Sequence, residues 1–141
     1  MPGKDPSHWL LRLSPAEWLA AAATEMESAR AALARRSHRP AVTHLRRAAG
    51  MACNALLCQA ERPHWGRSYM EHVTALGADP DVPADVQAAA RRLRETPAAA
   101  PALISLGRPG QLPDDATDLL RAAGTIIDWI AAEVSSSETG T

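Results

Sequence analysis

A chain of 141 residues has the length of one domain with a single hydrophobic core. Alanine makes up about a fifth of it, phenylalanine is absent and there is one tyrosine, a composition that favours helices and excludes a fold built from several strands. The formal net charge of −1 excludes a global electrostatic attraction to nucleic acid. We therefore predict one all-α domain over residues 1–141.

The first predicted helix covers residues 15–36. The sequence SPAE from Ser14 to Glu17 is a capping box with proline at the first helical position. Apolar residues then recur at helical spacing as far as Leu33. We expect residues 1–13 to form an N-terminal extension before this helix.

The second predicted helix covers residues 40–60 and opens at Pro40. At about 100° per residue, its alanines and leucines fill well over half of the helical circumference. A helix with so much apolar surface must be covered on two or more sides, so it is the central element of a bundle. The positions left for water form one strip: Thr43, Arg46, Arg47, Gly50 and Asn54.

The rest of the chain is predicted to form three further helices, an irregular segment and a C-terminal tail. Proline, glycine and aspartate mark the turns between the helices. We expect the irregular segment from Thr96 to Leu112 to pack over the bundle, because its leucines and isoleucine need cover. The predicted helices are 67–76, 83–95 and 113–134, followed by a flexible polar tail, 135–141. The architecture predicted is an up-down bundle of four to five helices.

The cysteines and the hydropathy pattern bear on location. Cys53 and Cys58 lie on one predicted helix and diverge by about 140°, so they cannot bridge each other. Two thiols without a disulfide framework suggest a reducing compartment. No apolar run resembles a signal peptide or approaches the roughly 20 residues that span a bilayer. We expect a cytoplasmic protein that does not associate with membranes.

Metal and cofactor signatures are absent from the sequence. It contains no Cys-x-x-Cys pair and no histidine pair at ligand spacing. Gly107 to Gly110 is a turn that lacks the glycine spacing and the Lys-Ser/Thr of a phosphate loop. We predict neither a metal site nor a cofactor.

Positive charge gathers in one part of the chain. Between Glu27 and Glu61 there is no acidic residue but there are six arginines. Guanidinium groups suit phosphate recognition, so a phosphate-bearing ligand is one interpretation. One alternative is that the arginines only face solvent at the corner between the first two helices. Another is that Trp65 caps the bundle end instead of stacking on a ligand. The predicted ligand-binding residues are Arg35, Arg36 and Arg39, with His64, Trp65 and Arg67 in the later turn.

His44 and the sequence AAGMACNALL from Ala48 to Leu57 resemble the second helix of the HEPN superfamily. That helix commonly reads as a small residue and His followed by A-A-E-K-A-x-K-A-L-L. The last predicted helix has the alanine-then-isoleucine pattern of the same family, at Ala123 and Ile126. The resemblance implies a four- or five-helix up-down bundle that often forms homodimers. It also implies either ribonuclease activity, frequently that of a toxin, or a non-catalytic module that pairs with a nucleotidyltransferase or another partner.

Catalytic members of that family carry an Arg, four to six residues and then a His, brought together at a dimer cleft. Arg39–His44 and Arg67–His72 have this spacing. Fourteen arginines and five histidines give about one or two such spacings by chance. Five positions on one helix diverge by about 140°, so Arg67 and His72 can converge only if Arg67 precedes the helix. No catalytic residue is assigned, and Arg67 and His72 remain the candidates.

His44 lies on the apolar side of its helix, beside Met51 and Ala55. A histidine there is more typical of a packed or interface position than of acid–base chemistry. The leading hypothesis is a non-catalytic HEPN-like binding or accessory module, homodimeric through His44, Met51 and Ala55. The alternatives are a metal-independent ribonuclease that uses an Arg-x4-His pair and a purely structural partner of another protein.

Overall fold

The computed structural model describes residues 9–60, 62–96 and 114–139, and this part of the chain contains helices and no strand. The all-α prediction is confirmed. Two short 3-10 turns accompany the helices, η1 (Trp9–Arg12) and η2 (Pro63–Trp65). The α-helices are α1 (Pro15–Ala34), α2 (His38–Gln59), α3 (Tyr69–Ala78), α4 (Ala84–Glu95) and α5 (Asp114–Thr139).

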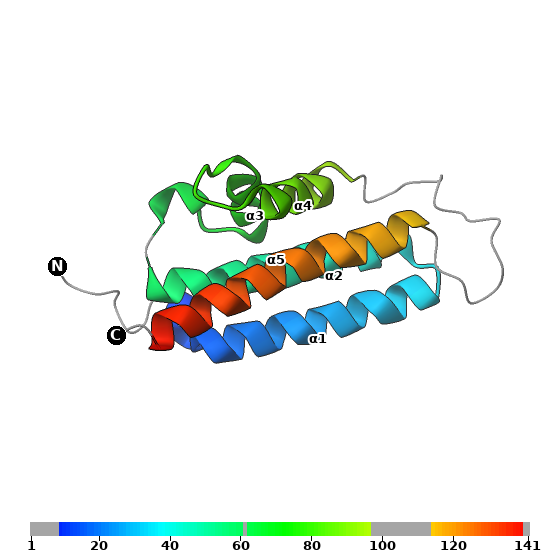
Figure 1. Ribbon diagram of the computed structural model, residues 1–141. Helices are drawn as coiled ribbons and strands as arrows, with labels where there is room; N and C mark the ends of the chain where they lie inside the picture. The colour runs from blue at the N-terminus through cyan, green and yellow to red at the C-terminus, as the bar shows by residue number, and fades with distance from the viewer. Residues whose placement is uncertain (1–8, 61, 97–113, 140–141) are drawn as a thin grey trace.

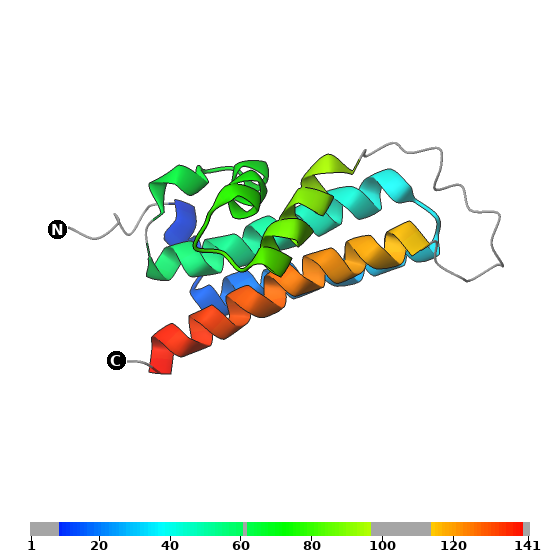
Figure 2. The ribbon, with the colours of Figure 1, turned by 45° about the horizontal axis from the view of Figure 1, so that its top comes forward.

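The three long helices lie lengthwise beside one another, and the two short ones cover one side of them (Figure 1). α1 runs antiparallel to α2, whereas α5 runs in the same direction as α2. α2 packs against α1, α5 and α3, and α4 bridges α3 and α5. Figure 2 shows α4 crossing the long helices at an angle. No helix in the described ranges is long and apolar enough to cross a membrane.

α2 is the central helix, as its sequence predicted. Most of its length from Ala41 to Leu57 is buried, because neighbouring helices cover it on several sides. The predicted strip for water was wrong at Gly50 and Asn54, both of which are buried under α3. Gly50 permits this close approach, since a Cβ there would lie only 2.4 Å from the Cβ of Tyr69.

Local capping signals set two of the helix starts. The Ser14 hydroxyl accepts from the Glu17 backbone N–H at 3.1 Å, and the Ser14 N–H donates to the Glu17 carboxylate at 2.9 Å. This capping box confirms the predicted start of α1. Ser68 and Glu71 form the same box at α3. α3 therefore begins at Tyr69, two residues later than predicted.

The described parts of the two chain ends, residues 9–13 and 135–139, differ from the predictions made for residues 1–13 and 135–141. Leu10, in the expected N-terminal extension, is buried, and its carbonyl accepts from Trp18 Nε1 at 2.8 Å. η1 is thus part of the bundle. α5 continues through Thr139, beyond its predicted end at about 134. The expected packed segment over 97–112 lies outside the described residues.

Candidate functional site

The two members of the candidate catalytic pair, Arg67 and His72, point to different environments. Arg67 precedes the N-cap Ser68 and is exposed, whereas His72, in the first turns of α3, is completely buried. His72 Nδ1 lies 2.8 Å from the Trp65 carbonyl oxygen, and Nε2 lies 3.0 Å from Asn54 Oδ1. The condition that Arg67 precede the helix is met, yet the structure does not bring the pair together at a cleft.

The buried histidine joins three elements of the fold. Burial lowers the pKa of His72, although its bond to the Trp65 carbonyl and the nearby Glu71 act in the opposite direction, so the neutral ring is favoured. In the neutral ring Nδ1–H donates to Trp65, and Nε2 needs a donor. Asn54 supplies one when its amide is rotated to place Nδ2 toward the ring. This rotation also gives a partner to Nδ2, which is otherwise buried without one among the described residues.

The histidine of the second Arg-x4-His spacing, Arg39–His44, takes part in a contact between α1 and α2. Glu25 of α1 pairs with His44 Nδ1 through Oε2 and with Arg47 through Oε1 at 3.2 Å. The Glu25 side chain is only 13% exposed, so this contact is largely shielded from water. Arg39 lies at the exposed start of the same helix. His44 therefore serves helix packing in the described chain.

The predicted dimer face of His44, Met51 and Ala55 is covered in part by the chain itself. Met51 is half-buried against the core and Ala55 is completely buried. Cys58 lies one turn beyond Ala55, and its sulfur is 3.5 Å from the Leu10 carbonyl oxygen of η1. Ala55 is thus unavailable to a partner subunit, while His44 and Met51 retain some exposed surface.

The predicted basic surface is divided between two ends of the bundle. Arg35 and Arg36 follow α1 and Arg39 begins α2, whereas the His64–Arg67 turn follows the far end of α2. A helix of 22 residues is about 33 Å long, so one small ligand cannot contact both groups. Figure 1 shows the α1–α2 corner and η2 at opposite ends of the molecule.

Trp65 is completely buried, which contradicts its assignment as a ring-stacking ligand residue. Its Nε1 donates to Asp79 Oδ2 at 2.9 Å, and His64 Nε2 lies 3.0 Å from the same oxygen. The hydrogen bond with His64 is the main cause that lowers the pKa of the buried Asp79 to about 2, against the opposing effect of burial. Arg62 Cζ lies over the Trp65 ring, 4.8 Å from its centroid. The alternative interpretation, that Trp65 caps the bundle end, agrees with these contacts.

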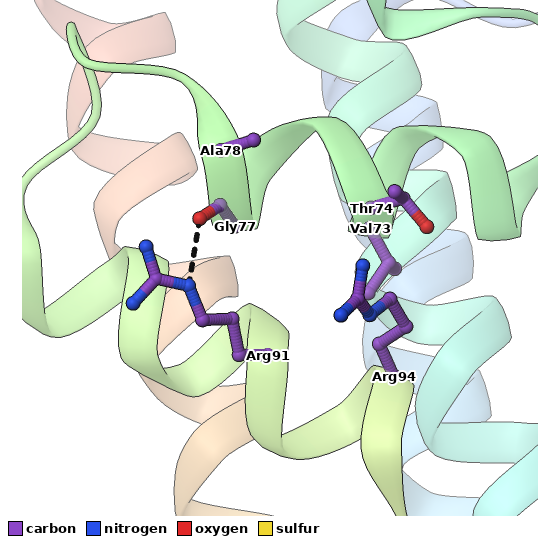
Figure 3. Close-up of a pocket in the computed structure, with 6 residues that line it drawn as sticks. All are labelled: Val73, Thr74, Gly77, Ala78, Arg91 and Arg94. Atoms are coloured by element: carbon purple, nitrogen blue, oxygen red, sulfur yellow. Dashed lines mark hydrogen bonds between the residues drawn. The ribbon is translucent and has the colours of Figure 1, made fainter.

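A cavity of about 210 Å³ lies between α3 and α4, and sequence reasoning missed it. Figure 3 shows two arginine side chains rising from α4, with Arg91 turned toward Gly77 and Arg94 toward Val73 and Thr74. Arg91 Nε donates to the Gly77 carbonyl oxygen at 2.9 Å. The run RRLR over residues 91–94 was the available signal, but it did not show which residues of α3 lie opposite. The lining residues are Val73, Thr74, Gly77, Ala78, Arg91 and Arg94, which we call the α3–α4 groove.

The described residues contain no group of three or more His, Cys, Asp or Glu side chains arranged to hold a metal ion. No protein-family model matches the chain, and no curated protein matches its sequence. Among solved structures, the crystal structure of an archaeal HEPN homologue is similar, with a TM-score of 0.63 and 22% identity. The match covers 86% of this chain and 98% of the other. The chain has a HEPN-like fold. This likeness concerns the arrangement of the helices.

Proposed function

We propose that the protein is a non-catalytic binding or accessory module with a HEPN-like fold. The observation that carries the proposal is the complete burial of His72, whose ring nitrogens contact Trp65 and Asn54. A general acid or base must come within hydrogen-bond reach of the reacting atoms. A histidine at the centre of a helix contact does not meet this requirement.

The rival function is a metal-independent ribonuclease that uses Arg67 and His72. In the described chain, His72 reaches an RNA only if α3 moves away from α2, which breaks its contact with Asn54. The second pair, Arg39 and His44, faces a similar obstacle because Glu25 holds His44 Nδ1. Both histidines support helix contacts, which favours binding over catalysis.

The binding role has two forms that the exposed surface supports. One is recognition of a phosphate-bearing ligand by arginines, of which the bundle exposes several on α4 and at the α1–α2 corner. The other is assembly with a protein, either a second copy of the chain or a partner such as a nucleotidyltransferase. The purely structural alternative shares the second form and differs in having no small ligand.

The deciding experiment is an RNA cleavage assay with purified protein and a fluorescent single-stranded RNA in EDTA. We expect no cleavage by the wild-type protein. The same assay is run on His72→Gln and His72→Asn, whose side-chain amides can each replace one ring nitrogen as a hydrogen-bonding group. Far-UV circular dichroism checks that each variant is folded. Cleavage that disappears in a folded His72 variant would establish the ribonuclease and end the accessory proposal. Sedimentation at micromolar concentration tests the homodimer, and a strict monomer would remove that part.

A further inference from the structure

We propose that the α3–α4 groove is an anion site that binds the phosphate group of a small phosphomonoester. This inference rests on the proposed binding function and gives it a location that the sequence did not indicate. The groove combines a defined cavity of about 210 Å³ with two guanidinium groups and one hydroxyl at its edge. Its volume corresponds to roughly seven water molecules at ~30 Å³ each, enough for a phosphate with a short organic group.

Arg91 contributes a guanidinium whose orientation is already set. Its Nε is bound to the Gly77 carbonyl oxygen, and the two terminal nitrogens make no hydrogen bond to a described residue. The C-terminal carbonyls of α3 carry partial negative charge, which by itself opposes an anion. The Arg91 bond to Gly77 offsets this charge at the wall of the groove. Holding a planar donor group in place before binding reduces the entropy lost when the ligand arrives.

Arg94 supplies the second guanidinium on the Thr74 side of the groove (Figure 3). Arg94 Nη2 lies 3.5 Å from Glu95 Oε1, and both side chains are about half exposed or more. An exposed pair of this kind is weak, so an anionic ligand can displace Glu95. The Thr74 hydroxyl is a further donor at the same edge.

Charge and donor number favour phosphate over carboxylate. Two guanidinium groups on different sides of a cavity can each donate to different oxygens of a tetrahedral dianion. A carboxylate has two coplanar oxygens and one charge, and a single guanidinium satisfies it. Val73, which also lines the groove, has an apolar side chain that suits the carbon atoms next to a phosphoester oxygen.

The test is a titration of the full chain followed by two-dimensional ¹H–¹⁵N NMR, with inorganic phosphate as the first probe at constant ionic strength. We expect shifts of the Thr74, Gly77 and Ala78 amides and of the Arg91 and Arg94 Nε–H signals. Glycerol 3-phosphate and ribose 5-phosphate should shift the same signals with equal or greater affinity. If acetate binds as well as phosphate, or if neither organic phosphate binds, the assignment to phosphomonoesters is wrong.

Three single-residue variants separate a site from general positive charge. Arg94→Gln should raise the dissociation constant for phosphate by about tenfold or more, because it removes a charge-assisted hydrogen bond. Glu95→Gln should lower it by removing the competing carboxylate. Arg92→Gln is the matched control, since Arg92 lies on the same helix but outside the groove, with Nη2 4.0 Å from Asp118 Oδ2. An equal loss in Arg92→Gln and Arg94→Gln overturns the proposal.

The outcome of the phosphate titration can be distinguished from the outcome of the RNA cleavage assay that tests the proposed function. RNA cleavage through His72 would refute the non-catalytic role, while the NMR shifts report on the groove independently. If phosphate leaves the groove signals unchanged, the groove inference fails, and protein assembly or the α1–α2 corner still supports a binding module. The NMR spectrum also shows whether each variant is folded, so an unfolded variant is not counted as a loss of binding.

Discussion

Gly50 lies on α2 where α3 crosses it, and replacing it with alanine tests how closely these helices pack. The new Cβ would lie 2.4 Å from Tyr69 Cβ and 2.5 Å from Tyr69 Cγ and Cδ1. Carbon atoms in favourable contact are about 3.5–4.0 Å apart, so α3 must move by roughly an ångström. Such overpacking costs about 1–3 kcal/mol, which exceeds the gain of about 1 kcal/mol in helix propensity. We expect Gly50→Ala to lower the free energy of unfolding.

Gly124 of α5 provides a matched control for the same substitution. A Cβ at Gly124 meets nothing within 4 Å among the described residues, so only the propensity term remains. Gly124→Ala should raise the free energy of unfolding by about 0.5–1 kcal/mol. Urea unfolding followed by far-UV circular dichroism measures both variants. If both glycines respond with the same increase in stability, the close contact between α3 and α2 is refuted.

Further predictions concern buried polar contacts. His72→Ala should lower the free energy of unfolding by about 2–4 kcal/mol, because it leaves Asn54 and the Trp65 carbonyl without partners, and a change below about 0.5 kcal/mol in urea unfolding would contradict this. Asp79 has its pKa lowered from 3.8 to about 2, so its stabilisation is present above pH 3.8 and is lost as the pH falls toward 2. The free energy of unfolding should fall by roughly 2 kcal/mol between pH 3.8 and 2, and Asp79→Asn should make it depend less on pH in this range. If the pH dependence is the same in both proteins, the stabilising role of the Asp79 carboxylate is ruled out. Arg46 donates to the carbonyls of Leu93, Arg94 and Thr96 at the end of α4, so Arg46→Gln should increase amide hydrogen exchange there, and equal protection in both proteins would count against this role.

Local signals in the sequence were sufficient for the first two long helices, α1 and α2. The capping box at Ser14 fixes the start of α1 through hydrogen bonds within four residues, so no tertiary information is needed. The apolar residues around most of the circumference of α2 likewise predict burial on several sides, whichever elements cover the helix. The bundle follows from these two features, and the similarity to an archaeal HEPN homologue agrees with it.

The placement of α3 and α4 could not be predicted in the same way. A helical wheel separates apolar from polar positions, but it does not distinguish water from a buried polar neighbour. Asn54 is polar and completely buried, because the His72 ring satisfies its amide. Gly50 has no side chain, so a helical wheel assigns it to neither the apolar nor the polar positions; its burial follows only from Tyr69, which lies over it. The predicted strip for water therefore failed where a second helix covers it.

The candidate site shows the same limit for charged residues. The sequence predicts one basic surface from Arg35, Arg36, Arg39 and the His64–Arg67 turn, although the length of α2 holds the two groups apart. Arg91 and Arg94 gain their setting from Thr74 and Gly77, which are more than a dozen positions earlier in the chain. Composition therefore predicts guanidinium groups as candidates for binding, whereas their location depends on how α4 lies on α3.

The Arg-x4-His spacing of Arg67 and His72 illustrates why a short motif requires its structural context. The capping box at Ser68 starts α3 and turns His72 inward with Val73 and Leu76, which are also completely buried. The same box leaves Arg67 before the helix, on the exposed side. A histidine that neighbouring helices must cover is favoured as a neutral, hydrogen-bonded group, and the lowered pKa of His72 follows from that environment. The local sequence that places both residues near the start of one helix thus also separates their side chains, so the spacing alone carries no catalytic geometry.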